Sequence, residues 1–353
     1  MNKGKKEMMA NVLTPLVIIC MAFLFASVLI LSAGFNPVAA FYHLFAGAFG
    51  TKASLINTIN KAVPIAFAGF AVALSKKAGI FNIGIEGQLI FGAFGSVLPG
   101  IFLKGLPAVI HIPVCLLSGM LFGAAYALLP TLLFVKRGTN LMVMGIMMNN
   151  IASLVITYLI VGPFAGKNAT VSSTEMVEES AFLPYIITKP NKLSIGILIV
   201  FAVAFLMWLF INKTSIGYEL KMCGANRQAA RYSGIKVTFY MTAALLLSGA
   251  LGGLAGGVEI LGNYHRMYDS FSPGYGFDGI PIALLTGGNP IGVIAGALLF
   301  GALRVGAMKM QTQVGISTEI ITVIQGTLVV LIACESLIRF QLSRAGRRKE
   351  EKA

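Results

Sequence analysis

The chain has 353 residues, of which 57% are hydrophobic and only 11% charged, and its mean hydropathy is +0.83. This composition lies outside that of soluble globular domains and indicates an integral membrane protein. A net charge of +14 could indicate a nucleic-acid partner, but the basic residues form short clusters between apolar runs, so none is expected. The four cysteines and three histidines are widely spaced, so neither a metal site nor a cofactor is expected.

Continuous apolar runs of about 20 residues predict membrane-spanning helices in a lipid bilayer, not the alternating strands of a barrel. A further apolar stretch, 278–308, is broken at Gly287, Gly288, Asn289 and Pro290, which favours a half-helix or a hairpin facing protein or water. We expect one all-α transmembrane domain over 1–353, a polytopic bundle of eight to ten helices whose first helix is retained. The predicted spans lie near 12–33, 55–74, 80–103, 107–135, 140–161, 193–211, 237–261 and 319–338.

Clusters of lysine and arginine predict which connections face the cytoplasm, because cytoplasmic loops of membrane proteins carry an excess of both residues. With alternate crossings, the N-terminus, the first two basic connections, the 212–236 loop and the C-terminal tail all fall inside. The 162–192 loop contains acidic, serine and threonine residues and is expected outside. The residues that carry this prediction are Lys3, Lys5, Lys6, Lys76, Lys77, Lys136 and Arg137 inside, and Glu175, Glu178 and Glu179 outside.

The sequence contains no motif typical of a catalytic domain. It lacks a Gly-x-x-x-x-Gly-Lys-Ser/Thr phosphate loop, a His-Glu-x-x-His pair and a Gly-x-Ser-x-Gly elbow. An intramembrane enzyme would need paired catalytic groups on facing helices, and no such pair is recognisable. The chain is therefore not expected to be an enzyme.

The 212–236 loop contains the stretch "ANRQAARYSGI", which predicts a short cytoplasmic helix of two to three turns. Asn226 is a suitable N-cap and Gly234 a suitable stop, with helix-forming residues between them. The helix could be a simple polar connector or a docking element for another protein.

The longer stretch "GANRQAARYSGI" resembles the coupling-helix region of ATP-binding-cassette (ABC) importer permeases that serve simple sugars, nucleosides and branched-chain amino acids. In such permeases this helix docks into a separate ATPase subunit, and the resemblance implies the same coupling role here. The matching residues are Gly224, Asn226, Ala229, Ala230, Arg231, Gly234 and Ile235.

A second region, "INKAVPIAFAGFAVALSKKAGIFNIGIEGQLIFGAFGS" over 59–96, is similar to the nucleoside-type (guanosine or purine nucleoside) permeases of that branch. Further matches are "MMNNIA" at 147–152, "SPGYGFDGIPIALL" at 272–285 and "GGNPIG" at 287–292, so the resemblance covers most of the chain. It departs at Ile85, where a small residue is usual in the family.

The resemblance implies a multi-pass permease of the bacterial cytoplasmic membrane that imports nucleosides by alternating access. The implied partners are an ABC ATPase subunit, a second permease that is homologous or identical, and an external solute-binding protein. A permease for a simple sugar or another small polar solute remains an alternative. An ion-coupled secondary transporter is a weaker one, because among the acidic residues only Glu86 clearly lies within a span.

Glu86 is the main candidate for a pathway residue, since a carboxylate in a span should face the bundle interior, a cavity or a partner. If its helix begins near Gly79, Glu86 lies about two turns from the cytoplasmic face and shares a helical face with Asn82, whereas Gln88 points elsewhere. It either holds helices together or contacts solute. The glycines at 84, 87, 92 and 95 favour close helix packing.

Other polar residues within spans are also candidates for the pathway. Asn149 and Asn150 are adjacent, so their amides cannot face the same way on a helix. Asn57 and Asn60 share a face near the outer end of their span, and Asp278, Thr286 and Asn289 are the polar members of the interrupted 278–308 stretch.

Overall fold

The computed structural model describes residues 20–21, 23–166, 171–316, 323 and 326–327. Within these residues seven helices are long and apolar enough to cross a membrane, which confirms the all-α polytopic prediction. The predicted span 319–338 lies outside the described residues except for three positions, and 12–33 is described only in its second half. The expected total of eight to ten helices therefore stays a prediction.

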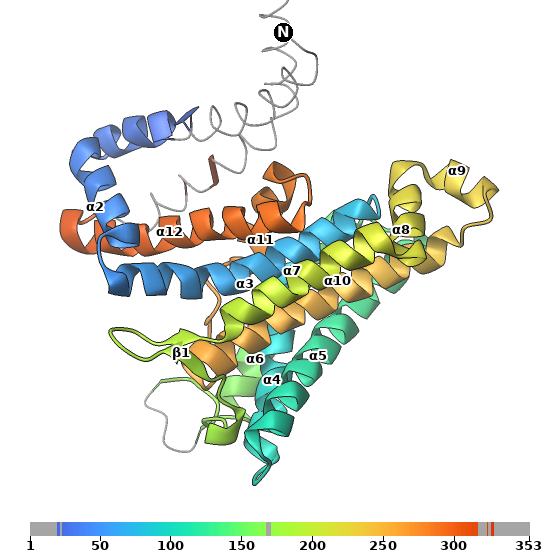
Figure 1. Cartoon of the computed structure of the whole chain (residues 1–353), viewed down its shortest axis with the longest axis horizontal. Helices are drawn as coiled ribbons and strands as arrows, with labels where there is room; N and C mark the ends of the chain where they lie inside the picture. Colours follow the sequence, from blue (N-terminus) through green and yellow to red (C-terminus); the bar gives the residue numbers. More distant parts are fainter. Residues whose placement is uncertain (1–19, 22, 167–170, 317–322, 324–325, 328–353) are drawn as a thin grey trace, which may run out of the picture. The chain divides into compact units, whose positions relative to one another are not determined.

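Helices follow one another through the chain with short connections, and the only described strands form one small hairpin (Figure 1). A short apolar helix, Phe23–Ser32, precedes the numbered elements. The numbered elements are α2 (Pro37–Phe49), α3 (Lys52–Lys77), α4 (Ile85–Phe102), α5 (Ala108–Arg137), α6 (Leu141–Val161), η1 (Glu179–Ala181), β1 (Tyr185–Ile187), β2 (Leu193–Ser194), α7 (Gly196–Lys213), α8 (Ser215–Ala225), α9 (Arg227–Tyr232), α10 (Val237–Glu259), the π-helical turn η2 (Ile260–Tyr264), α11 (Tyr275–Leu285) and α12 (Pro290–Val314).

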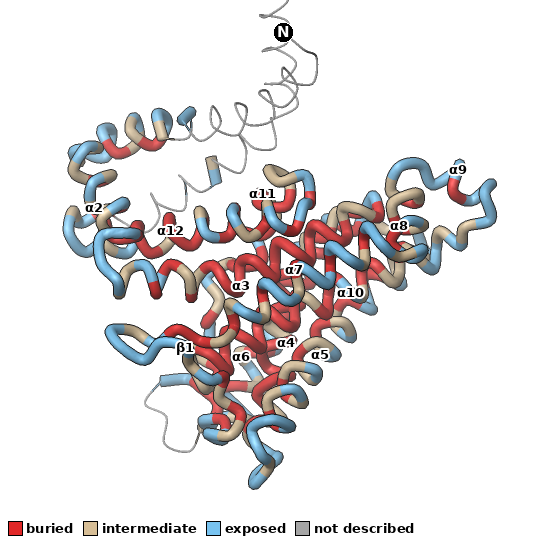
Figure 2. Tube along the Cα trace, viewed as in Figure 1, coloured by how far each residue is buried: buried red, intermediate tan, exposed pale blue. Residues whose placement is uncertain are grey.

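The larger of two compact units, Lys52–Ala302, is built around α10, which packs against α3, α4 and α5. Figure 2 shows α3 and α10 largely buried, whereas α5 exposes much of its surface. Small residues allow this packing: a Cβ atom on Gly92 of α4 would lie 2.0 Å from the Cα atom of Gly253 in α10. The close packing predicted for Gly92 is thus confirmed, and a larger residue there would push the two helices apart.

The smaller unit consists of the described parts of Met1–Thr51 and Leu303–Ala353. In it, α2 packs against the second half of α12, where Gly306 lies against the backbone of Leu44. Asn36 caps the start of α2 by accepting a hydrogen bond from the backbone N–H of Val38.

The basic connections gather at one end of the larger unit. Lysine or arginine occupies the last turn of α3, α5 and α7, and residues next to these ends share an apolar cluster that includes Ala78, Phe134 and Phe210. The acidic 162–192 segment contacts the other end, where the Glu178 N–H donates to the carbonyl of Gly100. This separation agrees with the charge asymmetry used to predict cytoplasmic and external connections.

The start of the 80–103 span differs from the prediction. Gly79 has a left-handed φ of +71°, residues 80–83 are not helical, and α4 begins only at Ile85. The Asn82 carboxamide oxygen accepts a hydrogen bond from the Gly84 N–H at 3.0 Å, a local bond that competes with helix formation. The prediction that Asn82 and Glu86 share one helical face was therefore wrong.

Gln88 points elsewhere than Glu86, as predicted, but Asn82 contacts Gln88 and not Glu86. The side-chain amide of Asn82 donates to Gln88 Oε1 at 3.1 Å and to the Ser248 hydroxyl of α10 at 2.9 Å. All three side chains are buried. Asn82, which precedes α4, therefore links Gln88 of α4 to Ser248 of α10.

The predicted break at 287–290 in the 278–308 stretch is confirmed, and it separates a short helix from one long enough to span a membrane. α11 has 11 residues and α12 has 25. Gly287 and Gly288 both have left-handed φ angles, +60° and +74°, which residues other than glycine rarely adopt. Asn289 then caps α12 by accepting a hydrogen bond from the Ile291 N–H at 3.1 Å.

Candidate functional site

The Glu86 carboxylate joins the starts of two helices. It lies in the first turn of α4, its side chain is buried, and Oε2 accepts a hydrogen bond of 2.6 Å from the Gly276 N–H in the first turn of α11. The amino ends of helices carry partial positive charge and unpaired N–H groups, which favour a carboxylate. Two converging helix starts therefore stabilise a charge that the bilayer core would otherwise disfavour.

Glu86 lies deeper than the sequence indicated. The far end of α11 reaches the basic end of the unit, because Lys77 Nζ donates to the Gly287 carbonyl at 3.0 Å. Eleven helical residues span about 16 Å, roughly half of the ~30 Å hydrocarbon core. Glu86, which contacts the start of α11, is therefore further from the basic end than the two helical turns expected. The reason is that the non-helical segment before α4 covers up to ~3.3 Å per residue, about twice the rise of a helix.

Asn149 of α6 supports the start of α4. Its carboxamide oxygen accepts from the Gly87 N–H at 2.8 Å, and its amide nitrogen donates to the Ile83 carbonyl at 3.0 Å. The N-cap residue of α4 is Gly84, which has no side chain to cap the helix, so Asn149 supplies the cap from a neighbouring helix.

Asn150 points away from this contact, so the prediction that the two amides diverge is confirmed. The Asn150 amide donates to the Ile146 carbonyl of its own helix at 3.1 Å, and its side chain is exposed.

Glu86, Asn149 and Asn150 all line one pocket of about 220 Å³ that is open on one side. Its walls come from α4, α6, the connection after η2 and the start of α11. The remaining lining residues are Ile90, Ile146, Ser153, Ile156, Thr157, Met267, Tyr268, Asp269, Ser270, Phe271, Ser272 and Phe277.

The polar residues of the 278–308 stretch do not line this pocket. Asp278 is buried in the first turn of α11. The Thr286 hydroxyl donates to the Ile282 carbonyl at 2.8 Å, and Asn289 caps α12. Thr286 and Asn289 thus shape the break between the two helices.

Asn57 and Asn60 contact the external segment instead of this pocket. Asn57 Oδ1 accepts from the Asn191 amide at 2.7 Å, and the Asn60 amide donates to the Lys192 carbonyl at 2.7 Å. Both therefore hold the β1–β2 hairpin against the outer end of α3.

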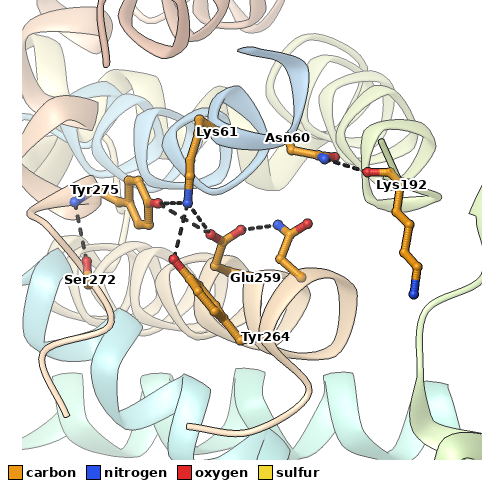
Figure 3. A network of polar contacts seen from close by, with 8 residues as sticks. Asn60, Lys61, Lys192, Glu259, Tyr264, Ser272 and Tyr275 are labelled. Atoms are coloured by element: carbon orange, nitrogen blue, oxygen red, sulfur yellow. Dashed lines mark hydrogen bonds and ion pairs between the residues drawn. The ribbon is translucent and has the colours of Figure 1, made fainter. Parts of the chain in front are cut away.

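A second charged group in the membrane was missed by the sequence-based prediction (Figure 3). Lys61 of α3 and Glu259 of α10 form an ion pair with an Nζ–Oε1 distance of 3.2 Å, and the Glu259 side chain is fully buried. The Asn263 amide donates to the other carboxylate oxygen at 2.6 Å. Because Glu259 lies within the predicted 237–261 span, the statement that only Glu86 clearly lies in a span was wrong. The pair could have been found from the sequence, because two predicted spans contain a lysine and a carboxylate of opposite charge.

Two tyrosines complete this network. Lys61 Nζ lies 2.7 Å from the Tyr275 hydroxyl and 3.2 Å from the Tyr264 hydroxyl, and the Tyr275 side chain is fully buried. The start of α11 is thus held on one side by Tyr275 and on the other by the bond between Glu86 and Gly276.

The predicted cytoplasmic helix is α9, which projects with α8 from the basic end of the unit (Figure 1). Asn226 caps it as predicted, accepting from the N–H groups of Gln228 and Ala229 at 3.0 and 3.1 Å. With six residues it is shorter than the predicted two to three turns. The N–H groups of Gly234 and Ile235 fold back to the carbonyls of Arg231 and Ala230 and end the helix in a turn. Gly234 ends that turn with φ +82°.

Most of α9 is exposed, as Figure 2 shows, and its exposed residues include Arg227 and Arg231. Ala230 is buried and accepts a hydrogen bond from the Ile235 N–H at 3.0 Å, whereas Ala229 and Arg231 are exposed. A shallow hollow of about 530 Å³ is lined by Arg227, Gln228, Arg231, Ile235, Lys236, Val237 and Thr238.

The inner side of the arm contacts the segment that leads to Glu86. A Cβ atom on Gly224 would lie 2.2 Å from the Lys77 carbonyl oxygen, so only glycine allows this approach. Two residues after Lys77, the Gly79 carbonyl accepts a hydrogen bond of 3.0 Å from the Arg227 guanidinium. The arm therefore contacts the first residues of the 78–84 segment, whose other end is the start of α4.

Comparison with known proteins agrees with these features. Residues 54–333 match the family model "Branched-chain amino acid transport system / permease component". The chain is 32% identical to the guanosine ABC transporter permease protein NupP of Bacillus subtilis, over 95% of this chain and 97% of the relative.

Two further relatives cover nearly the whole chain. The nucleoside ABC transporter permease protein NupB of Lactococcus lactis is 32% identical, over 98% of this chain and 95% of the relative. The glucose ABC transporter permease protein TsgB13 of Haloferax volcanii is 30% identical, over 94% and 90%. These matches confirm the resemblance drawn from the motifs: the chain belongs to the family of branched-chain amino acid transport system permease components.

Proposed function

We propose that the chain is a permease subunit of an ABC importer that carries nucleosides across the bacterial cytoplasmic membrane. Relatives named for guanosine and for nucleosides match it over nearly their full length, which supports this solute class. The glucose permease relative keeps a simple sugar as the second candidate. A separate ATPase subunit supplies the energy and an external solute-binding protein delivers the solute.

The observation that carries this function is the contact between the α8–α9 arm and the segment leading to Glu86. An exposed helix with Arg227 and Arg231 on its surface suits docking into an acidic groove of an ATPase subunit. Motion of the arm passes to the carbonyl of Gly79 through Arg227, and from there along residues 80–84 to α4. The start of α4 in turn holds α11 through Glu86.

The second permease is a homologous but different chain in this proposal. Two permease proteins named for the same solute occur in each of two organisms, NupP with NupQ in Bacillus subtilis and NupB with NupC in Lactococcus lactis. The present chain aligns over 95% and 98% of its length with the first of each pair, but over only 69% with the second. It therefore takes the place of the first member.

The test is uptake by the complete complex, purified through a tag on this chain and reconstituted in vesicles. ATP-dependent guanosine uptake that persists when ion gradients are collapsed is expected, with glucose as the competing solute. Arg231→Glu should abolish uptake without loss of assembly, whereas Lys136→Glu, which makes the same charge change at the exposed end of α5, should not. If the complex imported glucose but not guanosine, the solute would be a sugar and not a nucleoside. Full uptake by Arg231→Glu would refute the docking role of α9.

A further inference from the structure

The pocket beside Glu86 has walls that differ in chemistry. Its α6 wall presents Asn150, Ser153 and Thr157, which are three and four residues apart and therefore lie on one helical face. Asn150 and Ser153 are exposed on a helix apolar enough to span a membrane. Polar groups on such a surface are disfavoured against lipid, so this face meets water or a partner protein.

The connection after η2 contributes a carboxylate held in a fixed direction to the same pocket. The Thr157 hydroxyl donates to Asp269 Oδ1 at 2.6 Å, and the Asp269 N–H donates to the Ser172 carbonyl at 3.1 Å. The next residue, Ser270, has a left-handed φ of 55°, a strained conformation that is rare outside glycine and often found at functional sites. Asp269 is exposed, so its carboxylate remains accessible from the pocket.

An exposed aromatic ring also lines the pocket. Phe277, in the first turn of α11, exposes 44% of its surface and lines the pocket. Its neighbours in sequence fix its position, because the Gly276 N–H bonds to Glu86 and the Tyr275 hydroxyl joins the Lys61–Glu259 pair. Two buried polar contacts thus place one ring at the pocket surface.

We propose that this pocket is this chain's half of a nucleoside site, with Phe277 stacking on the base and Asp269 accepting a hydrogen bond from an N–H or O–H group of the nucleoside. Bases stack on aromatic side chains whatever their identity, because each base has a π-face. Carboxylates accept hydrogen bonds from the donor groups of base edges and hydroxyls. Glu86 acts as a positioning residue for Phe277.

The site is incomplete in this chain alone. A volume of about 220 Å³ is smaller than the ~300–1,000 Å³ of pockets that enclose a small molecule, and the pocket is open on one side. The polar face of α6 lies at that opening. The second permease therefore closes the site and contributes the other half. This inference rests on the proposed function.

Photolabelling tests the site directly. The complete complex in lipid nanodiscs is irradiated with 8-azidoguanosine, and the labelled peptides are mapped by mass spectrometry. Label is expected in residues 267–277, with competition by unlabelled guanosine and no competition by ribose or glucose. Competition by 2′-deoxyguanosine tests the 2′-hydroxyl, and competition by inosine tests the 2-amino group, as the donor that meets Asp269.

Four variants test the two contacts and control for folding. Phe277→Leu should lower labelling by roughly tenfold, whereas Phe277→Tyr, which keeps the ring, should retain it. Phe205→Leu changes a phenylalanine on α7 that is more exposed, at 61%, and lies outside the pocket, and it should label normally. Asp269→Asn keeps the shape of the side chain and should weaken labelling several-fold, because a charged acceptor binds more strongly.

Uptake by the same purified complexes, reconstituted in vesicles, separates the two proposals. Guanosine uptake with label elsewhere, or with Phe277→Leu labelled like the wild type, overturns the site and leaves the importer function standing. Absence of guanosine uptake overturns the solute class, and the nucleoside site with it. Competition by glucose as strong as by guanosine likewise excludes a base-stacking site.

Discussion

Lys61 and Glu259 form an ion pair between α3 and α10, with a distance of 3.2 Å and a fully buried carboxylate. Buried pairs add little net stability because both charges lose their hydration, but removing one partner leaves an unpaired charge that costs about 3–5 kcal/mol. Tyr275 shares this network, so the pair also fixes the start of α11.

We therefore expect Glu259→Leu to lower the free energy of unfolding by about 3 kcal/mol or more. The double variant Lys61→Met with Glu259→Leu should recover most of this loss, since no unpaired charge remains. The measurement is thermal unfolding of the purified chain in detergent. Lys221→Met, at an exposed lysine bonded to Asn212, serves as the control and should change little. A double variant less stable than both single variants would contradict the pair's role.

Glu86 should contribute more as a hydrogen-bond acceptor than as a charge. Glu86→Ala leaves the Gly276 N–H without its acceptor and should cost about 1–3 kcal/mol. Glu86→Gln keeps an acceptor oxygen and loses only the attraction between the carboxylate and the helix starts, about 1 kcal/mol. Hydrogen exchange at the amides of α11 should increase more in the alanine variant. Glu175→Ala, on the exposed external segment, is the control, and equal effects of both Glu86 variants would refute this ranking.

The features that could be predicted from the sequence depend on local patterns. Apolar runs predicted six of the seven described spans, all except α12, because lipid exposure requires continuous hydrophobic length. Asn226 and Gly234 bounded α9, because caps act within a few residues. The glycine break before Pro290 revealed the separation of α11 from α12 for the same reason.

The features that were missed depend on contacts between distant segments. The late start of α4 is stabilised by Asn149 from α6 and by Ser248 from α10, and hydropathy does not register either contact. Likewise, pairing of Lys61 with Glu259 joins residues 198 positions apart. Considered singly, Lys61 and Glu259 each lie near the end of an apolar run, and such a position predicts a side chain that extends to the membrane surface.

The contact between Gly79 and Gly224 should be needed for coupling. A Cβ atom on Gly79 would lie 2.9 Å from the Gly224 Cα atom, and the φ of +71° adds strain for any other residue. Gly79→Ala should therefore separate the α8–α9 arm from the segment before α4. In vesicles, the number of guanosine molecules imported per ATP hydrolysed should fall several-fold, while ATP hydrolysis itself continues.

Gly105→Ala is the matched control for this prediction. Gly105 has a similar φ of +78°, but a Cβ atom there has nothing within 4 Å. The alanine variant therefore carries the same backbone strain, about 1 kcal/mol, without a new contact. If both variants reduced coupling equally, strain alone would explain the effect and the contact would have no special role.

His265 makes the external end of the larger unit sensitive to acid. It directly follows the Val237–Tyr264 span, its ring stacks on Phe182, and Nε2 lies 2.6 Å from the Tyr185 hydroxyl of the hairpin. Burial lowers the pKa of His265 below its usual 6.5, and the positive charge of Lys192 lowers the pKa further. The folded protein therefore holds the ring neutral where the unfolded chain binds a proton.

Stability should consequently fall as the pH decreases from about 6.5 toward the lowered pKa of His265, by at most about 1.4 kcal/mol per pH unit. Above about 6.5 the ring is neutral in both states and this dependence disappears. His265→Asn removes the titration and suits the left-handed φ of 58° at this position, so its unfolding temperature should vary less between about pH 7.5 and 5.5. Tyr185→Phe removes the hydrogen bond but retains the histidine, and should keep the pH dependence. An identical pH profile for the wild type and His265→Asn would show that another group titrates in this range.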